Sequence, residues 1–265
     1  MKSKKKIWMF LTIVFASIAV VAVAWLVVYR VKLNRQQDEY NNLKNSVVLN
    51  GGDGSQSQTK EVVDLTPYNV PDKRIDFKSL KEKNQDIYAW ITIPDTNIDY
   101  PVLQHPTDLN YYIDYNMDGT KGYPGCICSQ FINSKDFDDF NTVLYGHNMN
   151  AGTMFANLHF YKDSEFFNSH PYIYVYTEEG TLVYQVFAAY TFTDIHLLMG
   201  FDLTKDEVRQ TYIDNIFELS GITDNFNRDV EVTTDSKILS LETCVNSQDD
   251  KRYIVAAVLV ADARQ

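Results

Sequence analysis

The sequence predicts a mainly β domain, a closed or nearly closed barrel, that follows an N-terminal membrane helix. Three observations support this fold class. Residues 7–29 form an uncharged apolar run, short segments rich in β-branched and aromatic residues recur between turn residues, and a single long helical pattern interrupts them near residues 204–221. Strands at such spacing are typical of barrels, in which closure removes the unpaired edges.

The apolar run from Ile7 to Tyr29 is long enough to cross a bilayer. As a helix its 23 residues would extend roughly 35 Å, against a hydrocarbon core of about 30 Å. A cleaved signal peptide is the alternative, because the small residues 22–24 resemble a cleavage site, but the apolar run continues beyond them. Four lysines precede the run, which favours a cytoplasmic segment at residues 1–6 and an uncleaved anchor at residues 7–29.

The next residues indicate a polar stalk, and the folded domain follows it. Residues 30–69 are mostly polar, the part before residue 50 can extend the anchor helix, and residues 50–60 read NGGDGSQSQTK, a composition typical of a linker. We therefore expect an extracytoplasmic domain at residues 70–265. All seven basic residues of positions 1–35 belong to the anchor region, so the remainder carries 24 − 7 = 17 basic against 35 acidic residues. This acidic balance argues against nucleic acid as a partner.

Seven segments of the domain have the composition of strands, and a short helix precedes the first of them. The helix is expected at Asp76 to Asn84. The strands are expected at Ile87 to Ile93, Tyr100 to Gln104, Thr142 to Gly146, Tyr172 to Thr177, Leu182 to Tyr190, Lys237 to Thr243 and Arg252 to Val260.

One longer helix is predicted between the strand that begins at Leu182 and the strand that begins at Lys237. Residues 204–207 (TKDE) have the pattern of a capping box, and apolar residues follow at helical spacing up to Leu219. Gly221 stands where a C-terminal cap is expected. The predicted barrel is therefore crossed by one long helix directly before the strand that carries Cys244.

Cys244 is the leading candidate for a reactive side chain. It is one of three cysteines, an odd number that leaves at least one thiol unpaired in an exported domain. It ends an apolar strand, and the polar residues 246–251 that follow are expected to form a loop. An unassisted thiol is mostly protonated at neutral pH, so a nucleophile here requires a base or a cation nearby.

Arg252 and His147 are the two candidates to assist that thiol. Arg252 starts the next strand, so a short loop can return it to the end of the barrel that carries Cys244, although a single arginine is more often an ordinary surface residue. His147 follows a strand through Gly146 and also stands where a strand meets a loop. The other four histidines have less distinctive settings and are expected at the surface or partly buried.

Cys126 and Cys128 are expected to be small core residues. In an extended segment they point to one face and are too close in sequence for an easy disulfide. A redox or metal role is the alternative, but no second nearby pair completes a zinc site.

The motifs around these residues resemble those of a known family. YGHNM (145–149), SLETC (240–244) and Arg252 resemble the histidine, TLxTC and arginine elements of sortases, over roughly residues 75–260. IDYPVLQ (98–104) and TMFANL (153–158) resemble the class B branch. The resemblance implies a sortase-like closed barrel of about eight strands, with one or more N-terminal helices and one long helix before the cysteine strand.

The resemblance also implies a function: a transpeptidase of a Gram-positive cell surface that cleaves a C-terminal sorting signal after threonine. Cys244 would form a thioacyl enzyme, His147 would act as general acid and base, and Arg252 would stabilise the oxyanion. The acyl group would pass to an amine of peptidoglycan or of a lipid-linked precursor, with no cofactor and no metal. Ser240, Thr243 and Glu242 would border the substrate groove; Ser240 replaces the usual threonine, and Glu242 occupies the variable position.

Three other functions remain open from the sequence. A cysteine hydrolase would resolve the same acyl enzyme with water, and an anchored binding module would carry an inert Cys244. A pilin-polymerising sortase often carries an Asp-Pro pair in an N-terminal lid, and this sequence contains no such pair. That absence lowers the third possibility without excluding it.

Overall fold

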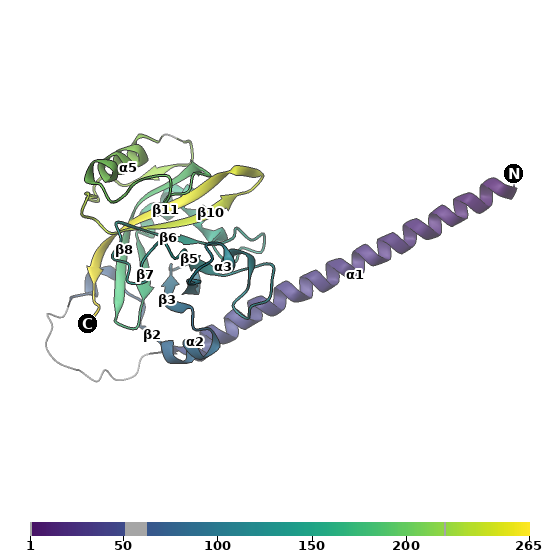
Figure 1. The fold of residues 1–265 in the computed structure, drawn as a ribbon, viewed down its shortest axis with the longest axis horizontal. Coiled ribbons are helices and arrows are strands. Elements are labelled where there is room, and N and C mark those ends of the chain that lie inside the picture. Colours follow the sequence, from purple (N-terminus) through teal and green to yellow (C-terminus); the bar gives the residue numbers. More distant parts are fainter. Residues whose placement is uncertain (1, 51–62, 220) are drawn as a thin grey trace. The chain divides into compact units, whose positions relative to one another are not determined.

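The computed structural model describes residues 2–50, 63–219 and 221–265, which belong to two compact units, Met1–Leu43 and Lys44–Gln265 (Figure 1). Helix α1 (Lys2–Val47) includes every described residue of the first unit. Its segment Lys5–Val47 is long and apolar enough to cross a membrane, with a mean hydropathy of 2.7 in its most apolar window. Apolar side chains are exposed along it from Ile7 to Val31, as expected for a helix without a protein core around it.

The second unit begins earlier in the chain than the expected domain start at residue 70. Strand β1 (Val48–Asn50) pairs antiparallel with β2 (Lys73–Ile75). The ammonium groups of Lys44 and Lys73 both contact the buried carboxylate of Asp99. Residues 44–50, expected in the stalk, therefore belong to the compact unit, whereas residues 51–60 of the expected linker lie outside the described residues.

Eight strands form a closed barrel, which confirms the predicted fold class. The order is β11-β10-β6-β5-β4-β3-β7-β8, and β8 pairs with β11 to close the cylinder; the two-residue β9 (Asn225–Phe226) pairs with β8. The barrel strands are β3 (Ile87–Thr92), β4 (Asp99–Leu103), β5 (Ile127–Ser129), β6 (Asn141–Tyr145), β7 (Tyr172–Tyr176), β8 (Thr181–Thr193), β10 (Ile238–Val245) and β11 (Gln248–Asp262). All seven predicted strands are present; β5 is the barrel strand that the sequence analysis did not predict.

Short helices connect the strands. The predicted helix before β3 is α2 (Phe77–Lys83), and the Asp76 carboxylate caps it by accepting the Ser79 N–H at 3.1 Å. The others are the 3₁₀ helix η1 (Thr66–Tyr68), α3 (Tyr111–Asp114), the 3₁₀ helix η2 (Ala156–Lys162), α4 (Ser164–Ser169) and α5 (Asp206–Glu218).

Helix α5 confirms the predicted long helix, but both predicted caps are wrong. The N-cap is Lys205, which makes no side-chain cap bond. The Thr204 hydroxyl, which was predicted to cap the helix, donates instead to the Asp202 carboxylate at 2.6 Å. At the other end the helix stops at Leu219 in an extended conformation. Gly221 N–H donates instead to the Asp224 carboxylate at 2.8 Å.

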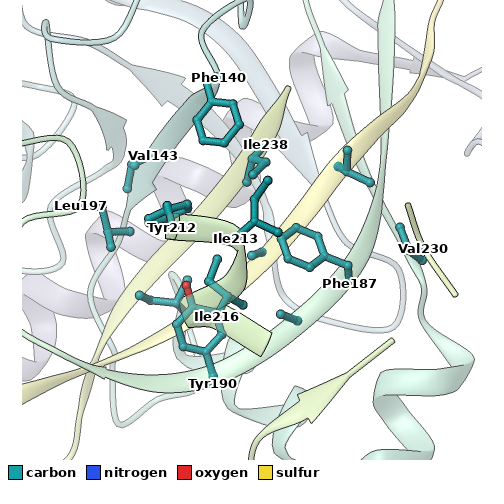
Figure 2. Close-up of a cluster of buried hydrophobic side chains, with 14 residues drawn as sticks. Phe140, Val143, Phe187, Tyr190, Leu197, Tyr212, Ile213, Ile216, Val230 and Ile238 are labelled. Carbon is teal, nitrogen blue, oxygen red and sulfur yellow. The ribbon is translucent and has the colours of Figure 1, made fainter. Parts of the chain in front are cut away.

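One face of α5 packs against the outer face of four neighbouring strands. Tyr212, Ile213 and Ile216 belong to one cluster of buried side chains that also includes Ile238 of β10 (Figure 2). Successive residues of a strand point to opposite faces, so Ser240, Glu242 and Cys244 share the outer face with Ile238. Helix α5 therefore covers the beginning of this face of β10, and Cys244 at the end of it is exposed.

Candidate active site

The hairpin that carries Cys244 differs from the predicted strand and loop. Strand β11 already begins at Gln248, so the expected loop at residues 246–251 is reduced to a tight turn at Asn246 and Ser247, with Ser247 at a φ of 61°. The loop prediction was wrong because the polar residues that follow the turn are the solvent-exposed end of β11 and not a connection. Cys244 is consequently held within a strand.

The pairing of this hairpin fixes Cys244 opposite Arg252. The two residues are direct antiparallel partners, and a β-bulge shifts the register between Cys244 and Val245. Direct partners in an antiparallel pair point to the same face of the sheet. The thiol and the guanidinium group therefore extend from adjacent strands into the same space, and that placement is set by register.

A pocket of about 240 Å³ opens at this end of the barrel. Its walls include Asn110, Ile113, Gln130, Gly146 and Thr243. Seven titratable or charged residues also line it: Tyr145, His147, Asp194, His196, Glu242, Cys244 and Arg252. The structure thus brings Cys244, His147 and Arg252 together in one pocket. In the sequence, Cys244 and Arg252 follow His147 by 97 and 105 positions.

His147 is positioned by the direct continuation of the β6–β10 pairing. Beyond the last paired residue of β6, Gly146 N–H donates to Glu242 O at 3.2 Å, and Gly146 O accepts the Thr243 hydroxyl at 2.7 Å. A Cβ at Gly146 would lie 2.5 Å from Ile127 Cδ1 and 2.8 Å from two atoms of the buried Phe155 ring. Glycine is therefore needed where β6 passes into the His147 loop.

One ring nitrogen of His147 is occupied by the protein. Nε2 lies 2.8 Å from the carbonyl oxygen of Ile113, and the ring of Tyr123 meets the imidazole at 64° with 4.8 Å between the centroids. A carbonyl oxygen only accepts, so Nε2 carries the proton in this contact. Gly125 lies behind the imidazole at a φ of 67°, and a Cβ there would approach Ile113 O to 2.7 Å.

Arg252 has both backbone and side-chain partners. Its Nη1 donates to the carbonyl oxygens of Asp249 and Lys251 at 2.8 and 2.9 Å, within the bulged part of β11. Its Nε lies 3.5 Å from Oε1 of Glu242. The guanidinium group is thus oriented by its own strand and only loosely paired with a carboxylate.

Glu242 forms a buried wall of the pocket. Its side chain is only 12% exposed. Burial raises the pKa of the carboxyl to about 7, and the nearby Arg252 charge lowers it only in part. The Tyr145 hydroxyl, on the neighbouring strand and in register with Glu242, is buried without a hydrogen-bond partner among the described residues.

The other two residues expected at the substrate groove have different surroundings. Thr243 contributes to the pocket lining, but its side chain is buried and its hydroxyl is bonded to Gly146 O. Ser240 is fully buried, and its hydroxyl donates to Asn141 Oδ1 at 2.8 Å beside Tyr212 of α5. Because α5 covers this part of β10, direct contact between Ser240 and a substrate is incompatible with its position.

Cys126 and Cys128 are buried free cysteines, as expected for core residues. Burial raises the pKa of the Cys128 thiol well above its ordinary value, which disfavours a thiolate there. Among the described residues, no group of three or more His, Cys, Asp and Glu side chains is placed to hold a metal ion. Of the three cysteines, Cys244 is the one whose thiol is exposed.

Sequence reasoning missed several polar residues of the site. His196 lines the pocket, and its Nε2 lies 2.6 Å from Gln130 Oε1, which joins two loops at the rim. Asn148 and His159 contact the main chain of Cys244. Only Asn148 carried a signal, since it directly follows His147 in the motif; the histidines gave none because their partners are distant in sequence.

Comparison with known proteins identifies the family. Residues 91–260 match the family described as Sortase domain. Sortase B of Listeria monocytogenes is 36% identical over 228 residues, which covers 83% of this chain and 87% of the relative. Sortase B of Staphylococcus aureus is 33% identical over 190 residues, which covers 71% and 75%.

Solved structures agree with these relatives. Sortase B of B. anthracis in complex with AAEK2 superposes with a TM-score of 0.66 at 32% identity, covering 89% of this chain and 97% of that one. The S. aureus sortase B–substrate complex gives a TM-score of 0.62 at 32% identity, with coverages of 69% and 84%. The chain therefore belongs to the sortase family. Its closed barrel and its relatives make it a sortase B-like cysteine transpeptidase.

Proposed function

We propose that this transpeptidase works through Cys244 as nucleophile, His147 as general acid and base, and Arg252 as the cation that stabilises the oxyanion. The observation that carries the proposal is the shared pocket. An exposed thiol, an arginine directly opposite it and a histidine anchored by one nitrogen line the same space. These are the groups that acyl transfer through a thioester requires.

In the first half of the reaction, the Cys244 thiolate attacks the carbonyl carbon of the scissile peptide bond. A C–S bond forms, and the negative charge moves to the carbonyl oxygen, where Arg252 stabilises it. The intermediate collapses with cleavage of the C–N bond. The departing amine takes a proton from protonated His147, and a thioester remains on Cys244.

In the second half, an incoming amine attacks the thioester carbonyl. Neutral His147 accepts the proton of that amine, a new amide bond forms, and the Cys244 thiolate departs. Since Nε2 of His147 is committed to Ile113 O, the proton exchanges through Nδ1. The same ring nitrogen therefore serves both halves of the reaction.

The acyl donor in this proposal is a C-terminal sorting signal cleaved after threonine. The acceptor is an amine of peptidoglycan or of a lipid-linked precursor. Similarity to the S. aureus sortase B–substrate complex supports a peptide substrate. Glu242 and Thr243 line the pocket and are the candidates for contact with the peptide. Ser240 is buried outside the pocket lining and is not one of them.

The same proposal includes a membrane topology. Residues 1–6 lie in the cytoplasm, residues 7–29 span the membrane, residues 30–43 form the stalk, and the compact unit Lys44–Gln265 holds the enzyme outside a Gram-positive cell. The apolar, exposed surface of α1 and its candidate membrane span support this arrangement. A cysteine-reactive reagent that does not cross membranes should label Cys244 on intact cells.

The test uses the full chain in detergent with fluorogenic sorting-signal peptides, with and without an amine acceptor. We expect cleavage and a ligated product, both of which disappear in Cys244→Ala and in His147→Gln. His170→Gln is the matched control, because His170 lies at the end of α4, where it contacts Asp95 rather than the pocket.

Three results would count against this function. Cleavage without ligation at saturating amine would indicate a hydrolase. Cleavage that survives in Cys244→Ala would show that the nucleophile is another residue. No cleavage of any sorting signal, together with retained peptide binding after alkylation of Cys244, would indicate a binding module.

A further inference from the structure

Two side chains converge on the main-chain carbonyl of Cys244. Asn148 Nδ2 lies 3.0 Å from this oxygen, and His159 Nε2 lies 3.1 Å from it. Asn148 belongs to the His147 loop, and His159 belongs to η2. Donors from two segments that are 96 and 85 positions away in the chain therefore meet at the nucleophile's own backbone.

The carbonyl at the centre of this arrangement identifies the tautomer of His159. A carbonyl oxygen only accepts, so His159 Nε2 carries the proton in its contact with Cys244 O. Asn148 Nδ2 lies 2.9 Å from the same Nε2, but both nitrogens then carry protons, so this close approach is not a hydrogen bond. The two protons of Nδ2 reach Cys244 O and, at 3.1 Å, Asn246 Oδ1. His159 Nδ1 is buried with no partner among the described residues, so a proton placed there would have no acceptor.

The surroundings of His159 favour the same neutral form. The centroid of its ring lies 4.9 Å from the centroid of the Tyr253 ring. The Lys162 ammonium lies over that same Tyr253 ring, 4.9 Å from its centroid. Burial and the positive charge of Lys162 lower the pKa of His159. The imidazole therefore stays uncharged at neutral pH and acts as a fixed donor.

The Cys244 carbonyl that these two donors hold lies where the regular pairing of β10 with β11 ends. The β-bulge of the hairpin lies between Cys244 and Val245, so the regular register ends at the peptide that these side chains hold. The loop that carries Asn148 is itself closed, with a bridge between Asn148 and Met154 and a bond from Phe155 N–H to His147 O at 3.0 Å. Fixing Asn148 against Cys244 therefore also fixes His147.

We propose that Asn148 and His159 form a carbonyl clamp that positions the Cys244 thiol relative to the His147 imidazole. This inference rests on the proposed function, because it assigns the two residues a task in that reaction. Neither is a catalytic residue here: both act on the main chain of the nucleophile. The relative position of the Cys244 thiol and the His147 imidazole depends on Asn148 and His159, because the bulge interrupts the strand ladder at the end of β10.

The expected effect is on turnover. Misplacement of a reacting group by about 1 Å can cost on the order of 100-fold in rate. We expect Asn148→Ala and His159→Ala each to lower kcat by roughly 10- to 100-fold with little change in KM. His159→Gln, whose amide nitrogen can donate at a similar distance, should recover most of the loss. The double variant should lose less than the product of the two single losses, because the side chains share one acceptor.

The experiment measures kcat, KM, melting temperature and the pH dependence of Cys244 alkylation by iodoacetamide, all on the full chain in detergent. Asn150→Ala is the matched control, since Asn150 is an exposed residue of the same loop. Alkylation depends on the environment of the thiol and does not require turnover. A changed alkylation profile in both alanine variants, with an unchanged one in Asn150→Ala, supports the clamp.

Two outcomes would overturn the inference. One is unchanged kcat and alkylation in both alanine variants. The other is a loss of activity that follows the melting temperature and is not recovered in His159→Gln, which indicates a purely structural role. If the wild-type chain alkylates at Cys244 but ligates no peptide, the proposed function fails, and the alkylation profiles of the variants still decide whether the clamp controls the thiol.

Discussion

Cys244 and Arg252 face each other as direct partners across the β10–β11 hairpin. The connection between them is a tight turn, so their relative position depends on strand pairing and not on the conformation of a flexible loop. A one-residue slip in register would turn one of the two side chains to the opposite face. The β-bulge after Cys244 marks the point beyond which this constraint ends.

Arg252→Lys should lose most of the activity although it keeps the positive charge. Lysine lacks the planar fork that lets Arg252 bond to the Asp249 and Lys251 carbonyls while it extends to the pocket. Loss of an oxyanion donor typically costs about 100- to 1,000-fold in kcat. Steady-state kinetics of peptide cleavage measure this, with Arg228→Lys as control because Arg228 bonds to Phe217 O on α5. Near-wild-type turnover in Arg252→Lys would show that charge alone suffices.

Glu242→Gln should stabilise the fold in a pH-dependent manner. The carboxyl has a pKa of about 7 in the folded chain against an ordinary value of 4.5, so the folded state holds the proton more tightly. The wild-type chain therefore loses stability as pH rises from about 4.5 to 7, by up to about 3 kcal/mol. Glutamine does not ionise and avoids that loss.

Denaturant unfolding at pH 5 and pH 8 tests this prediction. The stabilisation by Glu242→Gln should be larger at pH 8 than at pH 5. Glu218→Gln, at the exposed end of α5, is the control. An equal effect of Glu242→Gln at both pH values would mean that the carboxyl ionises with its ordinary pKa.

The same substitution should also change the pH dependence of substrate binding. Above pH 7 the ionised Glu242 attracts Arg252, whereas below pH 7 the neutral carboxyl leaves the guanidinium free to bind a substrate carbonyl. KM of the wild-type enzyme should therefore rise as pH increases through 7. In Glu242→Gln that inflection should be absent, and a KM profile identical to that of the wild type would contradict the assignment.

The barrel was predictable from the sequence because its strands carry their own signal. Segments such as Ile87–Thr92 and Tyr172–Tyr176 combine β-branched and aromatic residues with nearby turn residues. Strand β5 was missed since it has only three residues, too few for a pattern. The ends of α5 were missed because Asp202 and Asp224, outside the helix, take the groups that would have served as caps.

The candidate site was predictable only where residues belong to recognisable motifs. His147, Cys244 and Arg252 stand in such motifs, and the structure places them in one pocket. The hairpin turn was not predictable, because a polar hexapeptide at residues 246–251 has the composition of a loop as well as that of an exposed strand end. His159 was not predictable either, since a contact with a carbonyl 85 positions away leaves no local pattern.

Thr243→Val should affect both stability and turnover. The substitution keeps the shape of the side chain but removes the hydroxyl that donates to Gly146 O. Leaving a buried carbonyl unpaired costs about 1–3 kcal/mol, and because Gly146 precedes His147, we also expect lower kcat. Thr211→Val is the matched control, since its hydroxyl donates to Glu207 O on the exposed side of α5. A loss no larger than that of the control would show that Gly146 is held by its backbone bond alone.

Thiol counting should distinguish Cys244 from the other two cysteines. Cys126 and Cys128 are at most 1% exposed, whereas Cys244 is exposed at the pocket. Intact-mass analysis after brief treatment with iodoacetamide should find one adduct on the native chain and three after unfolding. Cys244→Ala should give no adduct in the native state and two after unfolding. A second adduct on the native chain would mean that the barrel opens at β5 on the timescale of labelling, because both buried thiols lie beside or within that strand and cannot be reached while it remains paired with β4 and β6.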